Sequence, residues 1–191
     1  MPLSPTGPIS LALENYRDLL KQSATWQAWV GATTGTTEEK ETAAKASTYL
    51  VDLPVPEAGI ERAYTRDELS QLRPFSIVDT YDDPSEPSLV ATQYSQDMFH
   101  ATQRMMACFE ADVPEDYATD PQNAKLAFLN NLGGVLSDLA ALAGRDANLV
   151  IVRINILPPG VMRTAEEDVP TYGDRFCAWV LIETLGGIGL S

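Results

Sequence analysis

The chain of 191 residues has little of what most enzymes use to build an active site. It contains two cysteines and a single histidine, His100. A Ser-His-Asp or Cys-His arrangement therefore has one possible base, and no serine lies in the G-x-S-x-G pattern of a nucleophile elbow. A zinc site would need ligands that this chain does not have in sufficient number. We therefore expect a protein that is not an enzyme, with no catalytic, cofactor-binding or metal-binding residues.

Phosphate-binding loops are missing as well. The glycine pairs Gly133-Gly134 and Gly186-Gly187 lack the Lys-Ser/Thr of a P-loop, and neither follows a strand and opens a helix as a dinucleotide-binding loop does. The two cysteines, Cys108 and Cys177, lie in apolar, strand-like segments. This setting favours reduced, buried, inert thiols over a disulfide or a metal site.

Positive charge is scarce. Lys and Arg number 13 against 27 Asp and Glu, for a formal net charge of −14. Proteins that grip nucleic acid gain their binding free energy from Lys and Arg that displace counterions, so the charge argues against such a surface. It is compatible with a surface past which nucleic acid slides without sticking.

Long apolar stretches are also missing. No window reaches about eighteen consecutive apolar residues, and the first residues lack the positive charge and apolar core of a signal peptide. With 45% hydrophobic and 21% charged residues, the composition is that of an ordinary globular protein. We expect a soluble protein made in the cytosol, without a membrane partner.

The last third of the chain carries the strongest pattern. Asp120 and Pro121 form a typical helix start, and Gly144 a natural end. Apolar residues between them recur at three- and four-residue steps and predict one buried helix face: Ala124, Phe128, Leu132, Val135, Leu136, Leu139 and Leu142. Gly133-Gly134 predicts either a bend or the close approach of another backbone.

Two apolar runs follow this helix, Asn148–Leu157 and Arg175–Gly186. Both predict strands, and the second is apolar at consecutive positions, which indicates a central strand with both faces covered. The segment Val161–Asp174 between them is acidic and has no periodicity. Its length predicts a solvent-facing loop that contacts a partner.

The rest of the chain alternates short helices with strands. We predict helices over Ile9–Leu20, from Ser23 to Gly31, after the capping box of Thr36 and Glu39, and from the second such pattern at Thr65 to Leu72. Strands are predicted over Thr48–Leu53, Arg73–Val78 and Ser95–Asp112, the last with a helix as the alternative.

Two local clusters suggest binding but have simpler explanations. Trp26 and Trp29 are close enough to form a ligand shelf, although core or subunit packing fits such large rings better. Asp79, Asp82 and Asp83 could hold a hard cation, although a solvated acidic turn fits better because no metal-loop spacing is matched.

These elements predict an α/β (α+β) fold, with a mixed, mainly antiparallel sheet packed against one long helix and extra N-terminal helices. We divide the chain into residues 1–63, a helical region with a short strand that forms an arm or part of the core, and residues 64–191, the α/β core.

The order of elements resembles that of the small neck and tail-completion proteins of tailed bacteriophages, especially lambda-like tail terminators. The residues that carry the resemblance are the run Arg73–Val78, the strand end at Phe109-Glu110 and the closing segment Gly173–Glu183 followed by glycines. The resemblance covers residues 65 to 187, and the region before it is larger than a minimal member of that family has.

The resemblance implies a structural virion protein that is located in the tail or neck and synthesised in the host cytoplasm. Such a protein forms a homohexameric ring on the tail tube, ends tube growth and joins the tail to the head-side connector. The implied partners are the tail tube protein, a sheath where the tail is contractile, and the neck or stopper protein, while DNA passes through the lumen. The Val161–Asp174 loop is the best candidate for a subunit contact.

Two alternative functions are compatible with the same sequence features. One is another head-tail connector or capsid-associated subunit, with the same fold class and a different stoichiometry. The other is a small enzyme that uses carboxylates and a divalent cation, in which Asp79, Asp82 and Asp83 would be the first residues to test.

Overall fold

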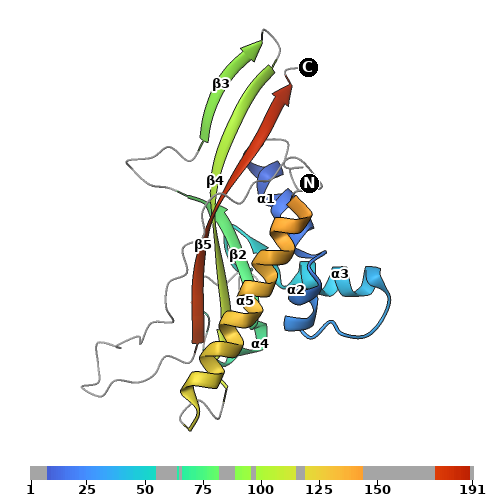
Figure 1. Ribbon diagram of the computed structural model, residues 1–191, viewed down its shortest axis with the longest axis vertical. Helices are drawn as coiled ribbons and strands as arrows, with labels where there is room; N and C mark the ends of the chain where they lie inside the picture. Colours follow the sequence, from blue (N-terminus) through green and yellow to red (C-terminus); the bar gives the residue numbers. More distant parts are fainter. Residues whose placement is uncertain are drawn as a thin grey trace, which may run out of the picture.

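The computed structural model describes residues 8–54, 64, 66–81, 89–95, 98–114, 119–143 and 175–189. These ranges form five helices and a five-stranded sheet (Figure 1). The elements in chain order are α1 (Pro8–Leu20), α2 (Ala24–Trp29), α3 (Thr37–Ala46), β1 (Thr48–Leu50), α4 (Arg66–Leu72), β2 (Phe75–Thr80), β3 (Leu89–Ser95), β4 (Met98–Asp112), α5 (Pro121–Ala143) and β5 (Arg175–Gly189).

The sheet is organised around β4. On one edge, β4 pairs antiparallel with β2 through its C-terminal half and with β3 through its N-terminal half. On the other edge, β5 pairs antiparallel along the whole strand, from Met98 opposite Gly189 to Asp112 opposite Arg175. β1 joins the far side of β2 in parallel. The prediction of a mixed, mainly antiparallel sheet with one long helix and extra N-terminal helices is confirmed.

Helices α1, α2 and α5 cover one face of this sheet. The Phe109 ring of β4 packs edge-on against Trp26 of α2, with ring centroids 5.7 Å apart. Phe176 of β5 stacks on Phe128 of α5 at 5.2 Å, and the Tyr16 hydroxyl of α1 lies 3.3 Å from Ser76 Oγ of β2. Residues on both sides of position 63 therefore contribute to a single hydrophobic core.

Side-chain caps determine where several of the helices begin. The Ser23 hydroxyl caps α2 by accepting a hydrogen bond from the Trp26 N–H at 3.0 Å, and Thr36 and Glu39 form the predicted capping box of α3. Asp120 accepts from the Asn123 N–H at 3.2 Å at the start of α5. These caps satisfy backbone donors that have no partner within the helix, as the sequence predicts.

Helix α5 follows the predicted apolar face closely. Its buried residues are Ala124, Phe128, Leu132, Val135, Leu136, Leu139 and Ala143. By length and composition, α5 is the one described helix that could cross a membrane, and core helices of globular proteins pass the same test. Gly134 lies where α2 approaches, because a Cβ at this position would come within 2.8 Å of Thr25 Cγ2.

The strands depart from the predictions in several places. β1 ends at Leu50 and not at Leu53, and β2 spans Phe75–Thr80 in place of the predicted Arg73–Val78. β3 was not predicted, because its polar residues lack clear alternation. β5 runs past Gly186 to Gly189, since the glycines still pair with β4. The prediction that both faces of β5 are covered is wrong at Trp179, whose side chain is 41% exposed. The predicted strand Asn148–Leu157 and loop Val161–Asp174 lie outside the described residues.

The sheet has a core half and a projecting half. β2 pairs with β4 only from Met105 to Glu110. Beyond Met105, towards Met98, the described neighbours of β4 are β3 and β5. In Figure 1 the upper ends of β3, β4 and β5 extend past the described helices. We call this part, residues 89–95, 98–103 and 184–189, the projecting ribbon.

Candidate functional site

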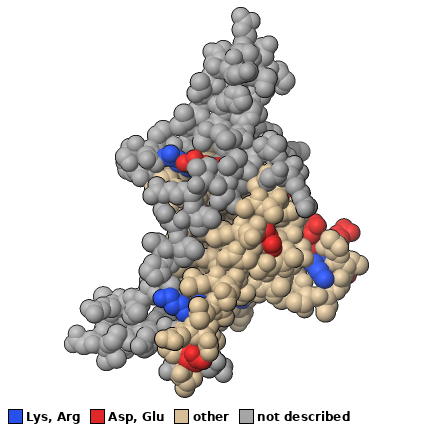
Figure 2. Space-filling view, viewed as in Figure 1, with Lys and Arg blue, Asp and Glu red and all other residues tan. Residues whose placement is uncertain are grey.

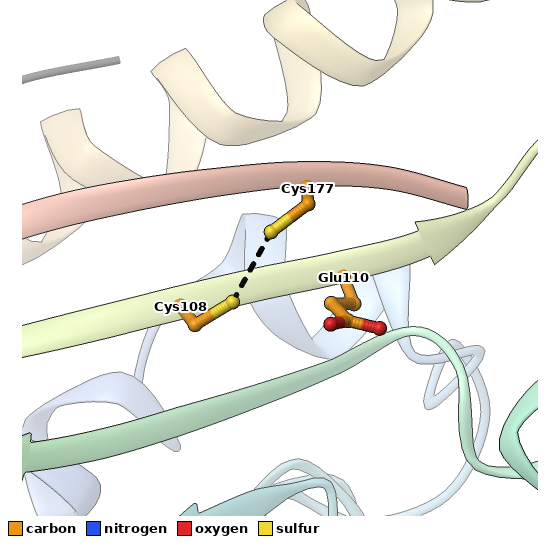
Figure 3. A group of neighbouring side chains, drawn as sticks. All are labelled: Cys108, Glu110 and Cys177. Carbon is orange, nitrogen blue, oxygen red and sulfur yellow. Dashed lines mark hydrogen bonds between the residues drawn. The ribbon is translucent and has the colours of Figure 1, made fainter. Parts of the chain in front are cut away.

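Two cysteines from distant parts of the chain meet on the sheet. Cys108 of β4 and Cys177 of β5 place their Sγ atoms 3.4 Å apart (Figure 3). The register sets Cys177 opposite Glu110 and Cys108 opposite Trp179, so the two cysteines are diagonal neighbours. Because side chains alternate along a strand, all four lie on the face of the sheet that points away from α5.

Glu110 completes this group. One carboxylate oxygen of Glu110 and the two Sγ atoms all lie within 4.8 Å of one another. Cys108 is buried, at 4% exposure, and Glu110 is nearly so at 9%, whereas Cys177 is half-buried. We refer to Cys108, Glu110 and Cys177 as the thiol–carboxylate cluster.

Two arginines hold the Glu110 carboxylate. Arg73 Nε lies 3.4 Å from Oε2, and Arg175 Nη1 lies 3.2 Å from Oε1. Arg73 also reaches Asp112, with Nη1 2.9 Å from Oδ1, and the Ser70 hydroxyl donates to the other Asp112 oxygen at 2.8 Å. The Arg73 side chain is only 1% exposed, so a nearly buried cation lies between two carboxylates.

The two thiols differ in acidity. The hydrogen bond with Cys177, together with burial, raises the pKa of the Cys108 thiol. The same hydrogen bond lowers the pKa of Cys177; burial and Glu110 oppose this shift, and the Arg175 guanidinium and the Trp179 side chain add to it. Cys177 is therefore the more acidic of the two thiols. Thiolates are the form of cysteine that binds metals and attacks electrophiles.

The sequence did not reveal this meeting of thiols. Cys108 is buried as expected, whereas Cys177 is only half-buried, so the expectation of two buried thiols is wrong for Cys177. The cysteines, 69 positions apart in sequence, become neighbours only through the pairing and register of β4 with β5. The available signal was that both cysteines lie in segments predicted as strands. Nothing in either segment specifies which strands pair or in which register.

The other candidate residues are distributed differently. Asp79 lies in β2, where its carboxylate accepts from the N–H of its own neighbour Thr80 at 2.7 Å. Asp82 and Asp83 lie outside the described residues. His100 is in β4, opposite Thr92 of β3 and Gly187 of β5.

The tryptophan pair belongs to the core. Trp26 is fully buried, and its Nε1 donates to the Ala44 carbonyl at 3.1 Å. Trp29 stacks parallel to Phe109 with centroids 6.3 Å apart. The expected core packing is confirmed for Trp26, and the half-buried Trp29 packs against that core.

Comparison with known proteins adds no relative: no family model matches the chain, and no curated protein matches it.

Proposed function

We propose that this chain is a structural subunit of a tailed-phage virion, of the tail-terminator type. In this proposal, six copies form a ring that caps the tail tube and joins it to the neck or stopper protein on the head side, with a sheath as an additional partner in a contractile tail. The DNA passes through the ring. The proposal requires a subunit with a compact core and surfaces suited to neighbouring copies.

The projecting ribbon is the observation that carries the proposal. β3 and β5 each have β4 as their one hydrogen-bonded neighbour among the described strands. Their outer edges carry backbone donors and acceptors that can pair with a strand of another chain. Few-stranded ribbons are marginal alone and gain stability when a neighbour covers a face or an edge. A ring provides each ribbon with such a neighbour.

The outer surface of α5 supports the same conclusion. Its 23 residues include only two charged side chains, Lys125 and Asp138, and Asp138 is bonded to α2. Leu126 is 54% exposed. Figure 2 shows few charged side chains over α5 in this view. A long, nearly uncharged helix surface is typical of one that contacts another protein.

The charge fits passage of DNA. A net charge of −14 repels phosphates, and a ring that carries it presents little for DNA to adhere to. A subunit that conducts DNA benefits from this property, whereas a DNA-binding protein does not.

The first experiment measures the mass of the purified protein by light scattering behind a sizing column, with negative-stain images of the same peak. We expect a six-subunit ring, or a monomer that becomes one when tail tube protein is added. A ring of another stoichiometry that binds head-side components would indicate a connector instead. A monomer or dimer indifferent to tube protein would overturn the proposal.

A matched pair of variants locates the contact. Leu126→Lys places a charge on the α5 surface, and Val51→Lys places one on an apolar residue of similar exposure, 58%, remote in the sequence from α5. We expect Leu126→Lys to raise the protein concentration needed for ring formation at least tenfold. Val51→Lys should leave that concentration unchanged. Leu126→Lys should unfold at the same denaturant concentration as the parent monomer, because its side chain is not buried. Val51→Lys should be no less stable than the parent, because it replaces a β-branched residue at a positive φ of 68°.

A further inference from the structure

We propose that Cys108, Cys177 and Glu110 bind a soft divalent cation such as Zn²⁺, which clips β5 to the central strand β4. This site is independent of ring formation, because all three ligands belong to one chain. It differs from the acidic turn considered above, whose oxygen ligands would suit a hard cation.

The distance between the sulfur atoms fits a metal better than a disulfide. Zinc–thiolate bonds are about 2.3 Å long, so two thiolates on a tetrahedral ion lie about 3.8 Å apart. The Sγ atoms are already 3.4 Å apart, and a small side-chain rotation admits the ion. Diagonal residues on antiparallel strands have Cα atoms about 7–8 Å apart, whereas disulfides need about 4.4–6.8 Å. A covalent bridge would therefore require the strands to shift.

Glu110 supplies the third ligand. It lies directly opposite Cys177 and two positions from Cys108, so all three side chains extend from the same face of the sheet. Arg73 and Arg175 hold its carboxylate and limit its rotation. Hydrogen-bonded partners of this kind are usual around metal-binding carboxylates, because they orient the ligand. Cys177 is half-buried and sits near the exposed Trp179, which leaves solvent to complete the coordination.

The charges of the cluster suit a divalent ion. Arg73 and Arg175 balance Glu110 and Asp112, so the group is neutral while both cysteines are thiols. Binding of M²⁺ releases one proton from each thiol, and the two thiolates balance the ion. The group therefore remains neutral around the nearly buried Arg73 and Glu110, which avoids the large cost of an uncompensated buried charge.

Cobalt provides a direct readout. The full-length protein is reduced with a phosphine, stripped with a chelator and titrated with Co²⁺, whose visible bands report tetrahedral thiolate coordination. We expect saturation at one ion per chain, loss of the bands when Zn²⁺ is added, and no effect of Mg²⁺ or Ca²⁺, which prefer oxygen ligands. Absence of the bands in the folded, reduced protein would overturn the proposal.

Three variants assign the ligands. Cys177→Ser should abolish the cobalt bands, and Glu110→Gln should weaken binding about 10- to 100-fold. Glu183→Gln is the matched control, because Glu183 is a β5 carboxylate paired with an arginine, Arg104 at 2.8 Å, away from the thiols. It should bind as the parent does. Equal affinity of all three variants would overturn the assignment.

Thermal unfolding of the parent protein tests the same site without any variant, and so does not depend on whether the variants fold. At a free Zn²⁺ concentration 100 times the Kd, the unfolding midpoint of the parent protein should rise by about 5–10 °C. The same concentration of Mg²⁺ should leave it unchanged. A midpoint indifferent to Zn²⁺ would contradict a site that joins β4 to β5.

Discussion

The two faces of the β4–β5 pair differ in what holds them together. The face towards the helices is apolar, with Phe109, Val180 and Ile182 fully buried. The opposite face carries the thiol–carboxylate cluster and its arginines. Strand alternation assigns each residue to a face, but only the covering elements decide whether that face becomes core. Burial of apolar area should therefore dominate stability on one face, and charge compensation on the other.

The largest effect should come from the apolar face. Phe109→Ala removes a ring that contacts both Trp26 and Trp29, and leaves a cavity that the surrounding helices cannot fill. We expect a loss of about 3–5 kcal/mol in the free energy of unfolding, measured by urea denaturation followed by circular dichroism. Trp179→Ala, which removes a larger but 41% exposed side chain from the other face, should cost about 1 kcal/mol. Equal losses would mean that the two faces are covered alike.

The next effect should come from the charged face. Arg73→Met removes the cation between Glu110 and Asp112, and we expect a loss of about 3 kcal/mol because a nearly buried carboxylate loses one of its partners. The control is Arg104→Met, whose ion pair with Glu183 is more exposed, at 27% and 19%, and should cost about 1 kcal/mol or less. Urea denaturation of both variants tests the difference. Similar costs would show that burial of Arg73 adds nothing.

The helices could be predicted because their signals are local. A cap such as Ser23 or Thr36 acts within four residues, and the apolar period of α5 extends over six turns of a single segment. Strand β3 was missed because its place depends on pairing with β4 and not on its own alternation.

The candidate site could not be predicted for a related reason. The sequence indicates that Cys108 and Cys177 lie in strands, but a shift of one residue in register would send one of them to the other face. The position of Glu110 between two arginines depends on the same register, and on Arg73 reaching the far end of β4. Contacts between distant segments determine the site, whereas contacts within segments determine the helices.

A smaller effect should come from the hydrogen bonds that the Asp138 carboxylate of α5 accepts from the start of α2. The Asp138 carboxylate accepts from the Thr25 N–H at 3.0 Å and from the Ser23 hydroxyl at 2.8 Å. Burial alone would raise the pKa of Asp138, but these hydrogen bonds outweigh it and lower the pKa. A lowered pKa in the folded state gives stability that is present above the ordinary value of 3.8 and is lost as pH falls through the folded value.

Asp138→Asn should therefore cost about 1 kcal/mol at neutral pH, since the amide is a weaker acceptor than the carboxylate for these two donors. The difference between parent and variant should shrink as pH falls from 3.8 through the lowered folded pKa of Asp138, below which the parent carboxyl is also neutral. Urea denaturation at several pH values measures this. A difference that stays constant down to low pH would assign the loss to packing instead of charge.

The smallest effects should come from the adjacent glycines Gly133 and Gly134 of α5, which differ in how closely α2 approaches them. A Cβ at Gly133 has no atom within 4 Å, so Gly133→Ala should raise the free energy of unfolding by about 0.5–1 kcal/mol through helix propensity. The same change at Gly134 gains that propensity but brings the Cβ within 2.8 Å of Thr25 Cγ2, on a stiff β-branched side chain. We expect Gly134→Ala to lower the free energy of unfolding by about 1 kcal/mol, because overpacking outweighs propensity.

Adding Thr25→Ala to Gly134→Ala removes the clashing methyl and should recover most of the loss. If Gly134→Ala stabilises the protein as much as Gly133→Ala does, then α2 does not pack closely on α5 at this point.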